Sequence, residues 1–169
     1  MKVAITGKMC SGKTSLAKLI QEQDNRYEIY SFGKKVKEVA VDLFDMKEKD
    51  RSLLVNIGTK MREIDSNVWV NYVINQTKDK EYCIIDDLRY QNEYDALIKN
   101  GFKVIQLIVD SKTQEERIIK TYPNNYEDHI KNRDHISEKN LFNWIETPTI
   151  INTTDSNSIE DTKEILDSL

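Results

Sequence analysis

The stretch Gly7-Lys8-Met9-Cys10-Ser11-Gly12-Lys13-Thr14 decides how the rest of the chain is organised. It reads G-x-x-x-x-G-K-T, the pattern of a phosphate-binding P-loop. The apolar run Val3-Ala4-Ile5 precedes it, and an amphipathic run over residues 16–20 follows it. This is the order of strand, loop and helix that the pattern needs, so we predict a nucleotide-phosphate site here.

Each part of the loop has a chemical role. The two glycines let the backbone turn tightly, so that successive N–H groups point at anionic oxygens. The helix that follows adds the positive end of its dipole. We expect Lys13 to reach the outer phosphates and the Thr14 hydroxyl to ligate Mg²⁺. The predicted phosphate-binding residues are Gly7, Lys8, Cys10, Ser11, Gly12, Lys13, Thr14 and Ser15.

Length and composition predict one globular domain over residues 1–169. The net charge of −4 does not support a nucleic-acid scaffold or a polybasic membrane binder. No apolar run approaches the ~18 residues of a membrane span, and the chain enters its first strand without a signal peptide. Cys10 and Cys83 are isolated from each other and from any histidine. We therefore expect reduced thiols and a cytoplasmic protein, in the host cytoplasm if the source is a phage or virus.

Strands alternate with helices along the chain. Apolar runs predict strands at residues 2–6, 82–85, 104–109 and 149–151, and residues 28–31 are predicted to form a short strand or a turn. Amphipathic spacing predicts helices at residues 13–23, 36–44, 53–64, 69–76, 90–98, 113–121 and 159–169, the fourth capped by Asp65 or Ser66. This alternation predicts an α/β sandwich of the P-loop NTPase type, with a parallel sheet between helical layers.

Ligands of such sheets bind at the carboxyl ends of the strands. Asp86 ends a buried apolar strand, where a carboxylate can hold Mg²⁺ opposite Thr14. The alternative is that Asp86 or Asp87 caps the next helix, and with two adjacent acids both can be true. Thr14 and Asp86 are the predicted metal ligands.

Only six of the 25 basic residues are arginines. Arg62, Arg89, Arg117 and Arg133 each fall near a predicted edge of the site, and guanidinium groups suit phosphate oxygens better than ammonium does. The alternative for each is a solvated surface position. Arg89 is the best candidate because it comes just after the two acids at a strand end, with only Leu88 between them. Lys13, Arg89, Arg117 and Arg133 are the predicted catalytic residues.

Several other side chains have two open interpretations. Phe32 and Trp69 could stack on a base or belong to the core. Lys34, near the start of a helix, could bind an acceptor phosphate or face solvent. His129 and His135 lie in a charged segment and are either exposed or order that segment. They receive no role as a base, because transfer to an existing phosphate needs none.

The predicted elements favour a small kinase among P-loop proteins. The chain lacks the Asn-Lys-x-Asp guanine motif of GTPases, and it is short for a motor or a transporter ATPase. A helical segment, residues 32–79, is inserted between the first helix and the next clear strand, and a charged segment, residues 113–140, precedes the last strand. We expect the first to bind an acceptor and the second to form a lid that excludes water.

Motifs over most of the chain resemble the deoxynucleoside monophosphate kinases of the bacteriophage and viral type. Residues 31–38 (SFGKKVKE) are similar to F-A-x-x-L-K-E, and residues 50–65 (DRSLLVNIGTKMREID) resemble D-R-x-L-L…I-G-T…M-R-x-I-D. Residues 86–93 (DDLRYQNE) resemble D-D-V-R-F-x-N-E, and residues 135–138 (HISE) resemble H-x-S-E. The chain departs from the family at three positions near the expected acceptor side. Gly33 stands where the family usually has Ala, Lys35 stands near its usual Pro-Leu, and Gln91 stands where it usually has Pro.

The resemblance implies transfer of the γ-phosphoryl group of ATP to a (deoxy)nucleoside monophosphate, with Mg²⁺ as cofactor. Position matching implies that Arg62, Trp69 and Arg89 face the acceptor. The full set of expected acceptor-binding residues is Phe32, Lys34, Arg62, Trp69, Arg89 and Glu93. No nucleic-acid or membrane partner is expected, and a homodimer stays open. Two alternatives also stay open: a kinase of another phosphorylated metabolite, and a nucleotide-binding switch without catalysis.

Overall fold

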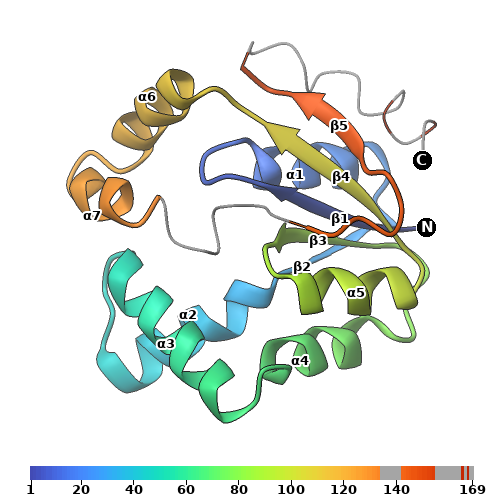
Figure 1. Cartoon of the computed structure of the whole chain (residues 1–169), viewed down its shortest axis with the longest axis horizontal. Helices are drawn as coiled ribbons and strands as arrows, with labels where there is room; N and C mark the ends of the chain where they lie inside the picture. The colour runs from blue at the N-terminus through green and yellow to red at the C-terminus, as the bar shows by residue number, and fades with distance from the viewer. Residues whose placement is uncertain (134–141, 155–164, 166, 168–169) are drawn as a thin grey trace.

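The chain folds around a five-stranded parallel sheet (Figure 1). The structure is a computed structural model, and it describes residues 1–133, 142–154, 165 and 167. The strand order is β2-β3-β1-β4-β5, so the strand before the P-loop is central. The strands are β1 (Lys2–Gly7), β2 (Glu28–Tyr30), β3 (Cys83–Leu88), β4 (Phe102–Ile108) and β5 (Thr149–Asn152).

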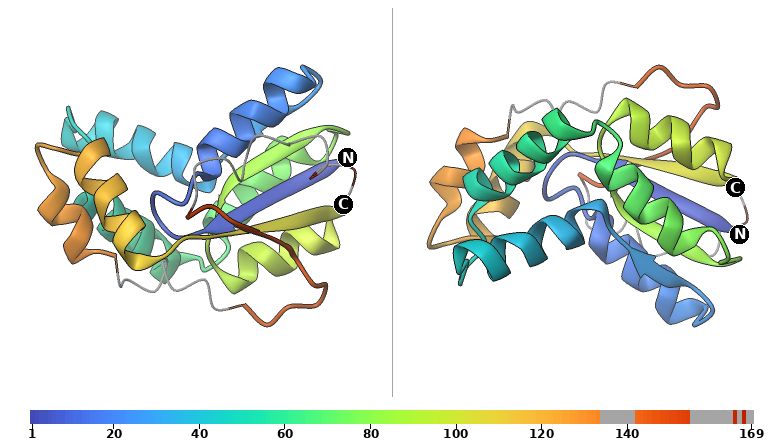
Figure 2. Two further views of the ribbon diagram at one scale, coloured as in Figure 1. Left: turned by 90° about the horizontal axis from the view of Figure 1, so that it is seen from above. Right: turned by 90° about the horizontal axis from the view of Figure 1, so that it is seen from below.

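Helices cover both faces of this sheet, which confirms the predicted fold class. Figure 2 shows α1 on one side of the strands and α5 on the other. The helices are α1 (Lys13–Gln23), α2 (Phe32–Phe44), α3 (Arg51–Ile64), α4 (Val68–Thr77), α5 (Gln91–Lys99), α6 (Ser111–Thr121) and α7 (Tyr126–Lys131). Helices α2, α3 and α4 follow one another between β2 and β3, within the segment that was predicted to be an insert.

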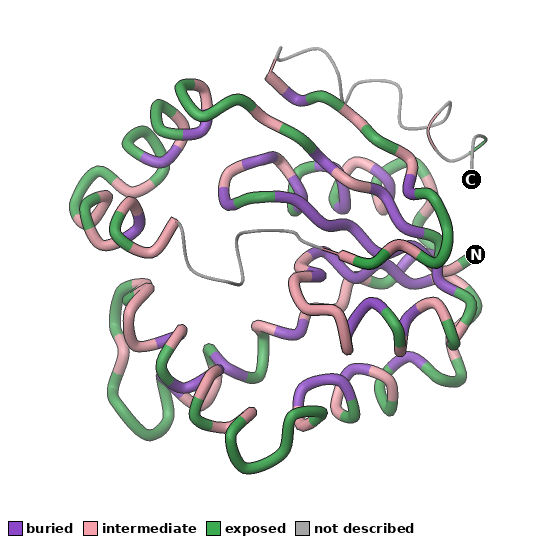
Figure 3. Tube along the Cα trace, viewed as in Figure 1, coloured by how far each residue is buried: buried purple, intermediate pink, exposed green. Residues whose placement is uncertain are grey.

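The side chains of β1 alternate between two hydrophobic cores. Val3 and Ile5 pack with α1 on one face, whereas Ala4 belongs to the cluster that includes α2, α4 and α5. All three are fully buried, and most residues of β3 and β4 are classed as buried too (Figure 3). A parallel sheet that is covered on both faces needs such continuous apolar runs, and this is why these strands could be predicted from the sequence.

The structure corrects three sequence-based boundaries. Strand β3 continues through both acids to Leu88, so Asp86 and Asp87 lie inside the strand rather than after it. Helix α4 begins after Asn67, and Asp65 accepts a hydrogen bond from the Asn67 N–H at 2.8 Å instead of capping the helix itself. Residues 126–131 form the short helix α7, in the charged segment where we predicted no helix after residue 121.

Some expectations lie outside the described residues. His135, the H-x-S-E resemblance and most of the predicted last helix belong to this group. Among the residues that the structure describes, no helix is long and apolar enough to cross a membrane. Cys10 and Cys83 are both free thiols.

Candidate active site

The P-loop joins the end of β1 to the start of α1, and its glycines are required by geometry. Gly7 has φ +149°, and a Cβ atom at this position would lie 2.6 Å from the carbonyl oxygen of Leu107. Gly12 precedes α1 with φ 97°, in the left-handed region that glycine occupies at little cost. Cys10 also has a positive φ, 59°, at the tip of the loop. The loop thus turns tightly against the neighbouring strand β4.

Lys13 is held at the mouth of this loop. Its Nζ donates to the carbonyl oxygens of Gly7 and Lys8, both at 2.7 Å, and the side chain is buried. Gly7 and Lys8 therefore hold Lys13 through their carbonyl oxygens, and neither residue lines the cavity described below. Ser11 is buried too, and its carbonyl accepts a hydrogen bond from the Thr153 hydroxyl. These contacts fix the loop and place one ammonium group where an anion would enter.

Thr14 and Asp86 form the predicted pair of oxygen ligands. The Thr14 hydroxyl donates to Asp86 Oδ2 at 2.8 Å, across from α1 to β3. Burial, with a smaller contribution from the charge of Asp87, raises the pKa of Asp86, whereas Thr14, Lys37 and Lys13 lower it. A hydroxyl and a buried carboxylate at one edge of the cavity are the kind of oxygen donors that Mg²⁺ binds. These residues therefore fit a magnesium ion.

Asp87 connects β3 to the start of α2. Its carboxylate accepts hydrogen bonds from the Ser31 hydroxyl at 2.7 Å, the Phe32 N–H at 2.8 Å and the Gly33 N–H at 2.7 Å. Two of these donors are backbone groups that have no partner within the helix. Asp87 therefore caps α2, an earlier helix, and not α5, the helix that follows it in the chain. The N-terminus of α2 is thereby fixed beside the Asp86 carboxylate.

Glu93 holds two of the arginine-bearing segments together. Its carboxylate accepts from Arg62 Nη2 at 3.0 Å, from the Arg89 N–H at 2.9 Å and from the Tyr90 N–H at 3.1 Å. The Arg62 guanidinium also lies 3.9 Å from the centre of the Tyr90 ring. Burial raises the pKa of Glu93 to about 7, against the lowering effects of Arg62 and the two backbone donors. The carboxylate is thus engaged in orienting Arg62 and the backbone of Arg89.

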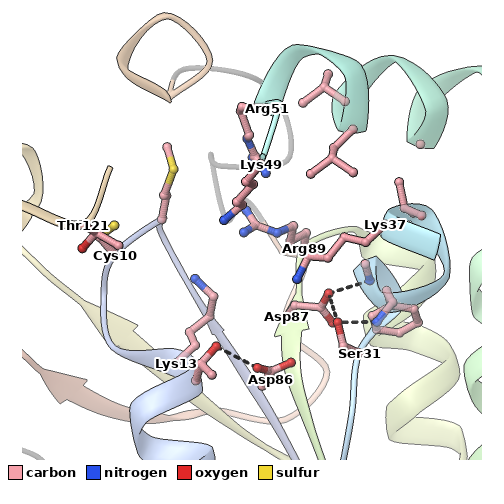
Figure 4. A pocket seen from close by; sticks show the side chains of 18 of the residues that line it. Cys10, Lys13, Ser31, Lys37, Lys49, Arg51, Asp86, Asp87, Arg89 and Thr121 are labelled. Atoms are coloured by element: carbon pink, nitrogen blue, oxygen red, sulfur yellow. Dashed lines mark hydrogen bonds between the residues drawn. The ribbon is translucent and has the colours of Figure 1, made fainter. Parts of the chain in front are cut away.

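These elements surround one cavity of about 820 Å³ (Figure 4). The P-loop, the end of β3, helices α2 and α3, and helix α6 all contribute to its walls. Its basic lining residues are Lys13, Lys37, Lys49, Arg51, Arg62, Arg89 and Arg117. Asp86, Asp87 and Glu93 are the acids in the lining. A cavity with this excess of cationic groups is suited to a polyanionic ligand.

Helix α6 is tied to the P-loop. Arg117 donates to the carbonyl oxygens of Cys10, at 3.5 Å, and of Thr153. Gln114, one turn earlier, donates to the carbonyl oxygen of Met9 at 3.0 Å. The guanidinium of Arg117 therefore lies beside the loop and lines the cavity.

Helix α7 packs against the P-loop and against the start of α3. His129 is completely buried, stacks on the Tyr122 ring at 3.8 Å and lies 3.3 Å from the sulfur of Met9. Of the two interpretations of His129, the exposed one is therefore wrong, and the residue orders its segment. Lys49 donates to the Tyr122 hydroxyl at 2.6 Å from the other side. The segment around α7 thus contacts both the P-loop and the connection before α3.

Besides Gly7, Lys8 and Ser11 of the P-loop, three predicted site residues do not line the cavity. Trp69 is a core residue, and its indole N–H donates to the carbonyl oxygen of Gly58 at 3.2 Å. Lys34 is exposed, because its position on α2 faces solvent. Arg133 forms an ion pair with Glu115 at 3.1 Å, away from the P-loop. Phe32 lines the cavity, although most of its ring is packed in the core.

The sequence analysis missed three basic residues of the lining. Lys49 and Arg51 lie in a charged connection that looks solvent-exposed from composition alone, and both are partly buried against the cavity. Lys37 was overlooked in favour of Lys34. The available signal was helical spacing, because Lys37 follows Gly33 by four residues and so shares its face of α2.

Comparisons with known proteins agree with this architecture. A family model described as an AAA domain matches residues 3–141. A gluconokinase from Sinorhizobium meliloti superposes with a TM-score of 0.64 at 12% identity, covering 99% of this chain and 91% of that one. The protein TT1252 from Thermus thermophilus gives 0.64 at 12% identity, with coverages of 100% and 97%. A search of curated proteins found no significant match.

A third solved structure shares the fold over its full length. It is a deoxyadenosine kinase from M. mycoides with the products dCMP and dCDP bound. The TM-score is 0.55 at 22% identity, and all of both chains is covered. Similarity at these identities establishes a common fold.

Proposed function

The chain belongs to the family described as an AAA domain, and from this premise we propose that it is a kinase that moves the γ-phosphoryl group of ATP to a (deoxy)nucleoside monophosphate. The product would be the diphosphate. Support for a kinase comes from the fold, which is shared with a gluconokinase and a deoxyadenosine kinase. Support for a phosphorylated acceptor comes from the cavity.

The observation that carries the proposal is that one cavity joins the P-loop to basic residues of α3 and the β3–α5 connection. Lys13 and Thr14 line the cavity from the P-loop and the start of α1, whereas Arg51, Arg62 and Arg89 line it from α3 and the β3–α5 connection. A P-loop that only sensed a nucleotide would not need a second group of cations facing it. A second phosphorylated ligand would use them, because guanidinium groups bind phosphate oxygens in bidentate fashion.

The residues have distinct proposed roles. The P-loop backbone and Lys13 would bind the donor phosphates, and Arg117 would contact them from α6. Thr14 and Asp86 would hold Mg²⁺, which would neutralise charge on the donor phosphates. Arg62 and Arg89 would bind the acceptor phosphate, with Glu93 fixing their orientation. Because that acceptor oxygen is already anionic, the reaction needs positioning and charge neutralisation rather than a general base.

The resemblance motifs at residues 31–38, 50–65 and 86–93 support a nucleotide as the acceptor. Residues 32–79 would bind this acceptor, and residues 113–140, which include most of α6 and all of α7, would act as the lid. A kinase of another phosphorylated metabolite is the principal competing function, since a cationic cavity alone does not distinguish one phosphate ester from another.

The proposal is tested by ADP release in a coupled assay with ATP and Mg²⁺. The acceptors are the four deoxynucleoside monophosphates, their ribose counterparts, gluconate, shikimate and a blank without acceptor. We expect turnover with one or more nucleoside monophosphates and no turnover above the blank with the two unphosphorylated acids. Turnover with gluconate or shikimate instead, or a flat panel from protein that binds ATP, would overturn the proposal.

A further inference from the structure

We infer that Lys37 of helix α2 contacts the phosphoryl group in transit, from the side of the cavity opposite Lys13. The inference rests on the proposed kinase function and adds a catalytic residue to it. Two ammonium groups, one from the P-loop and one from the helices between β2 and β3, would then meet the transferred group. None of the motifs that we interpreted from the sequence assigned this position a role.

The first support is where the Lys37 side chain lies. It lines the cavity, and in Figure 4 it extends from α2 over Asp87 towards Arg89 and the P-loop side. Asp86, the proposed metal ligand, lines the same cavity and is labelled beneath Asp87 in that view. The Lys37 ammonium group therefore shares the cavity with the group that we propose binds Mg²⁺.

The second support is that Lys37 has no hydrogen bond or ion pair with any residue that the structure describes. Other cations of the lining already donate to protein groups: Lys13 to two carbonyls, Lys49 to a tyrosine, Arg62 to Glu93 and Arg117 to two carbonyls. A cavity-lining ammonium group without a protein partner is the one best placed to bind an incoming anion.

The third support is the way the fold aims this side chain. Helical side chains lean towards the N-terminus of their helix, so Lys37 leans over the turn that contains Gly33. Gly33 has no side chain to obstruct it, and a Cβ there would lie 3.0 Å from Asp87 Oδ2. Asp87 also caps this turn, so its carboxylate fixes the first turn of α2, over which Lys37 leans.

The K37R substitution keeps the positive charge but changes the length and the head group of the side chain. The K37A substitution removes the charge together with most of the side chain. We therefore propose steady-state kinetics on wild type, K37A, K37R and the control K35A, with the best acceptor of the panel. Lys35 is exposed on the same helix and pairs only with Glu38 on the surface, so K35A matches the loss of charge. Thermal unfolding of each variant checks that it is folded.

We expect K37A to lose about 10²-fold or more in kcat, the scale for removing one preorganised donor. The KM of K37A for ATP should change less than threefold. The kcat of K37R should recover part of the loss, and the kcat of K35A should stay within twofold of that of wild type. A kcat for K37A within threefold of that of K35A would overturn the inference.

A second measurement keeps this inference separable from the choice of acceptor. ADP with aluminium fluoride and Mg²⁺ places a phosphoryl-like group next to the P-loop, and its affinity is read from the shift in thermal unfolding. We expect wild type to bind this mixture at least tenfold more tightly than K37A, with equal affinities for ADP alone. If no acceptor is turned over, the proposed function fails, and this comparison still decides the inference: equal affinities in the two proteins would refute it.

Discussion

Asp128 of α7 caps the first turn of helix α3, accepting hydrogen bonds from the backbone N–H groups of Arg51 at 2.9 Å and Ser52 at 3.2 Å. The Ser52 hydroxyl donates to the same carboxylate. Burial favours a raised pKa for Asp128, but these donors from Ser52 and Arg51 outweigh it and hold the pKa below its usual range. Two segments far apart in the sequence, α7 and the start of α3, are thereby joined.

Replacing Asp128 by alanine should loosen this contact. A charged cap of this kind contributes about 1–2 kcal/mol to the free energy of unfolding, and we expect a loss of that size in urea denaturation. Amide exchange in α3 and α7 should accelerate, while exchange in the central strands should not. Glu127→Ala, an exposed acid next to it in α7, is the control and should change neither. Unchanged exchange in α3 would show that Asp128 does not hold the two segments together.

Gly7→Ala should damage the fold more than a change at another glycine with positive φ. Its Cβ would lie 2.6 Å from the Leu107 carbonyl oxygen, which is backbone and cannot move aside. We expect a loss of about 2–4 kcal/mol in stability, from steric overlap plus an unfavourable φ. The control Gly101→Ala also has a positive φ, 77°, but its Cβ would meet nothing within 4 Å, so it should cost only ~1 kcal/mol. Equal losses would mean that the P-loop relaxes around a methyl group.

The raised pKa of Glu93 should make the free energy of unfolding depend on pH. Its pKa is about 7 in the folded protein and 4.5 in the unfolded chain, and burial is the main cause. Between these values the unfolded state releases a proton that the folded state keeps, so the free energy of unfolding falls as pH rises. The full difference is about 3 kcal/mol at the usual 1.36 kcal/mol per pKa unit. Urea denaturation from pH 5 to pH 8 should show this decline in wild type and a flatter profile in Glu93→Gln. Equal slopes would contradict it.

The central architecture could be predicted because its signals are local. The P-loop spacing and the apolar strands around it follow from backbone geometry and burial on both faces, and both are visible in short windows of sequence. Helix α7 could not be predicted in this way. It is six residues long, and its order comes from the stacking of His129 on Tyr122 and from the contact of Asp128 with α3, both of which are tertiary.

The predicted site was least accurate where only the fold determines which way a side chain faces. Lys34 and Lys37 are three residues apart on α2, and only the packing of that helix against Asp87 shows that the second one faces the cavity. The residue type of Trp69 is compatible with stacking on a ligand, but the orientation of α4 places this side chain in the core. Motif positions thus identified the segments of the site more reliably than the individual side chains.

Asp86→Asn should separate metal binding from stability. The change keeps the shape of the side chain and an acceptor for the Thr14 hydroxyl, but it removes the charge that we propose binds Mg²⁺. We expect the Mg²⁺ concentration for half-maximal turnover to rise about tenfold or more. Because burial raises the pKa of Asp86, its charge is unfavourable in the fold, so the variant should unfold at the same temperature or higher. An unchanged Mg²⁺ titration would remove Asp86 from the metal site.

Arg89→Ala should reduce turnover with the fold intact. Arg89 follows β3 directly, lines the cavity, and has its backbone N–H held by Glu93 at 2.9 Å, so its position is fixed independently of its guanidinium. Losing that group should lower kcat by roughly 10²-fold or more, the scale of one charge-stabilising donor. Arg133→Ala is the matched control, since Arg133 pairs with Glu115 outside the cavity and its loss should leave kcat within twofold. Near-normal turnover in Arg89→Ala, or an equal loss in both variants, would mean that the cations facing the P-loop do not act on the reaction.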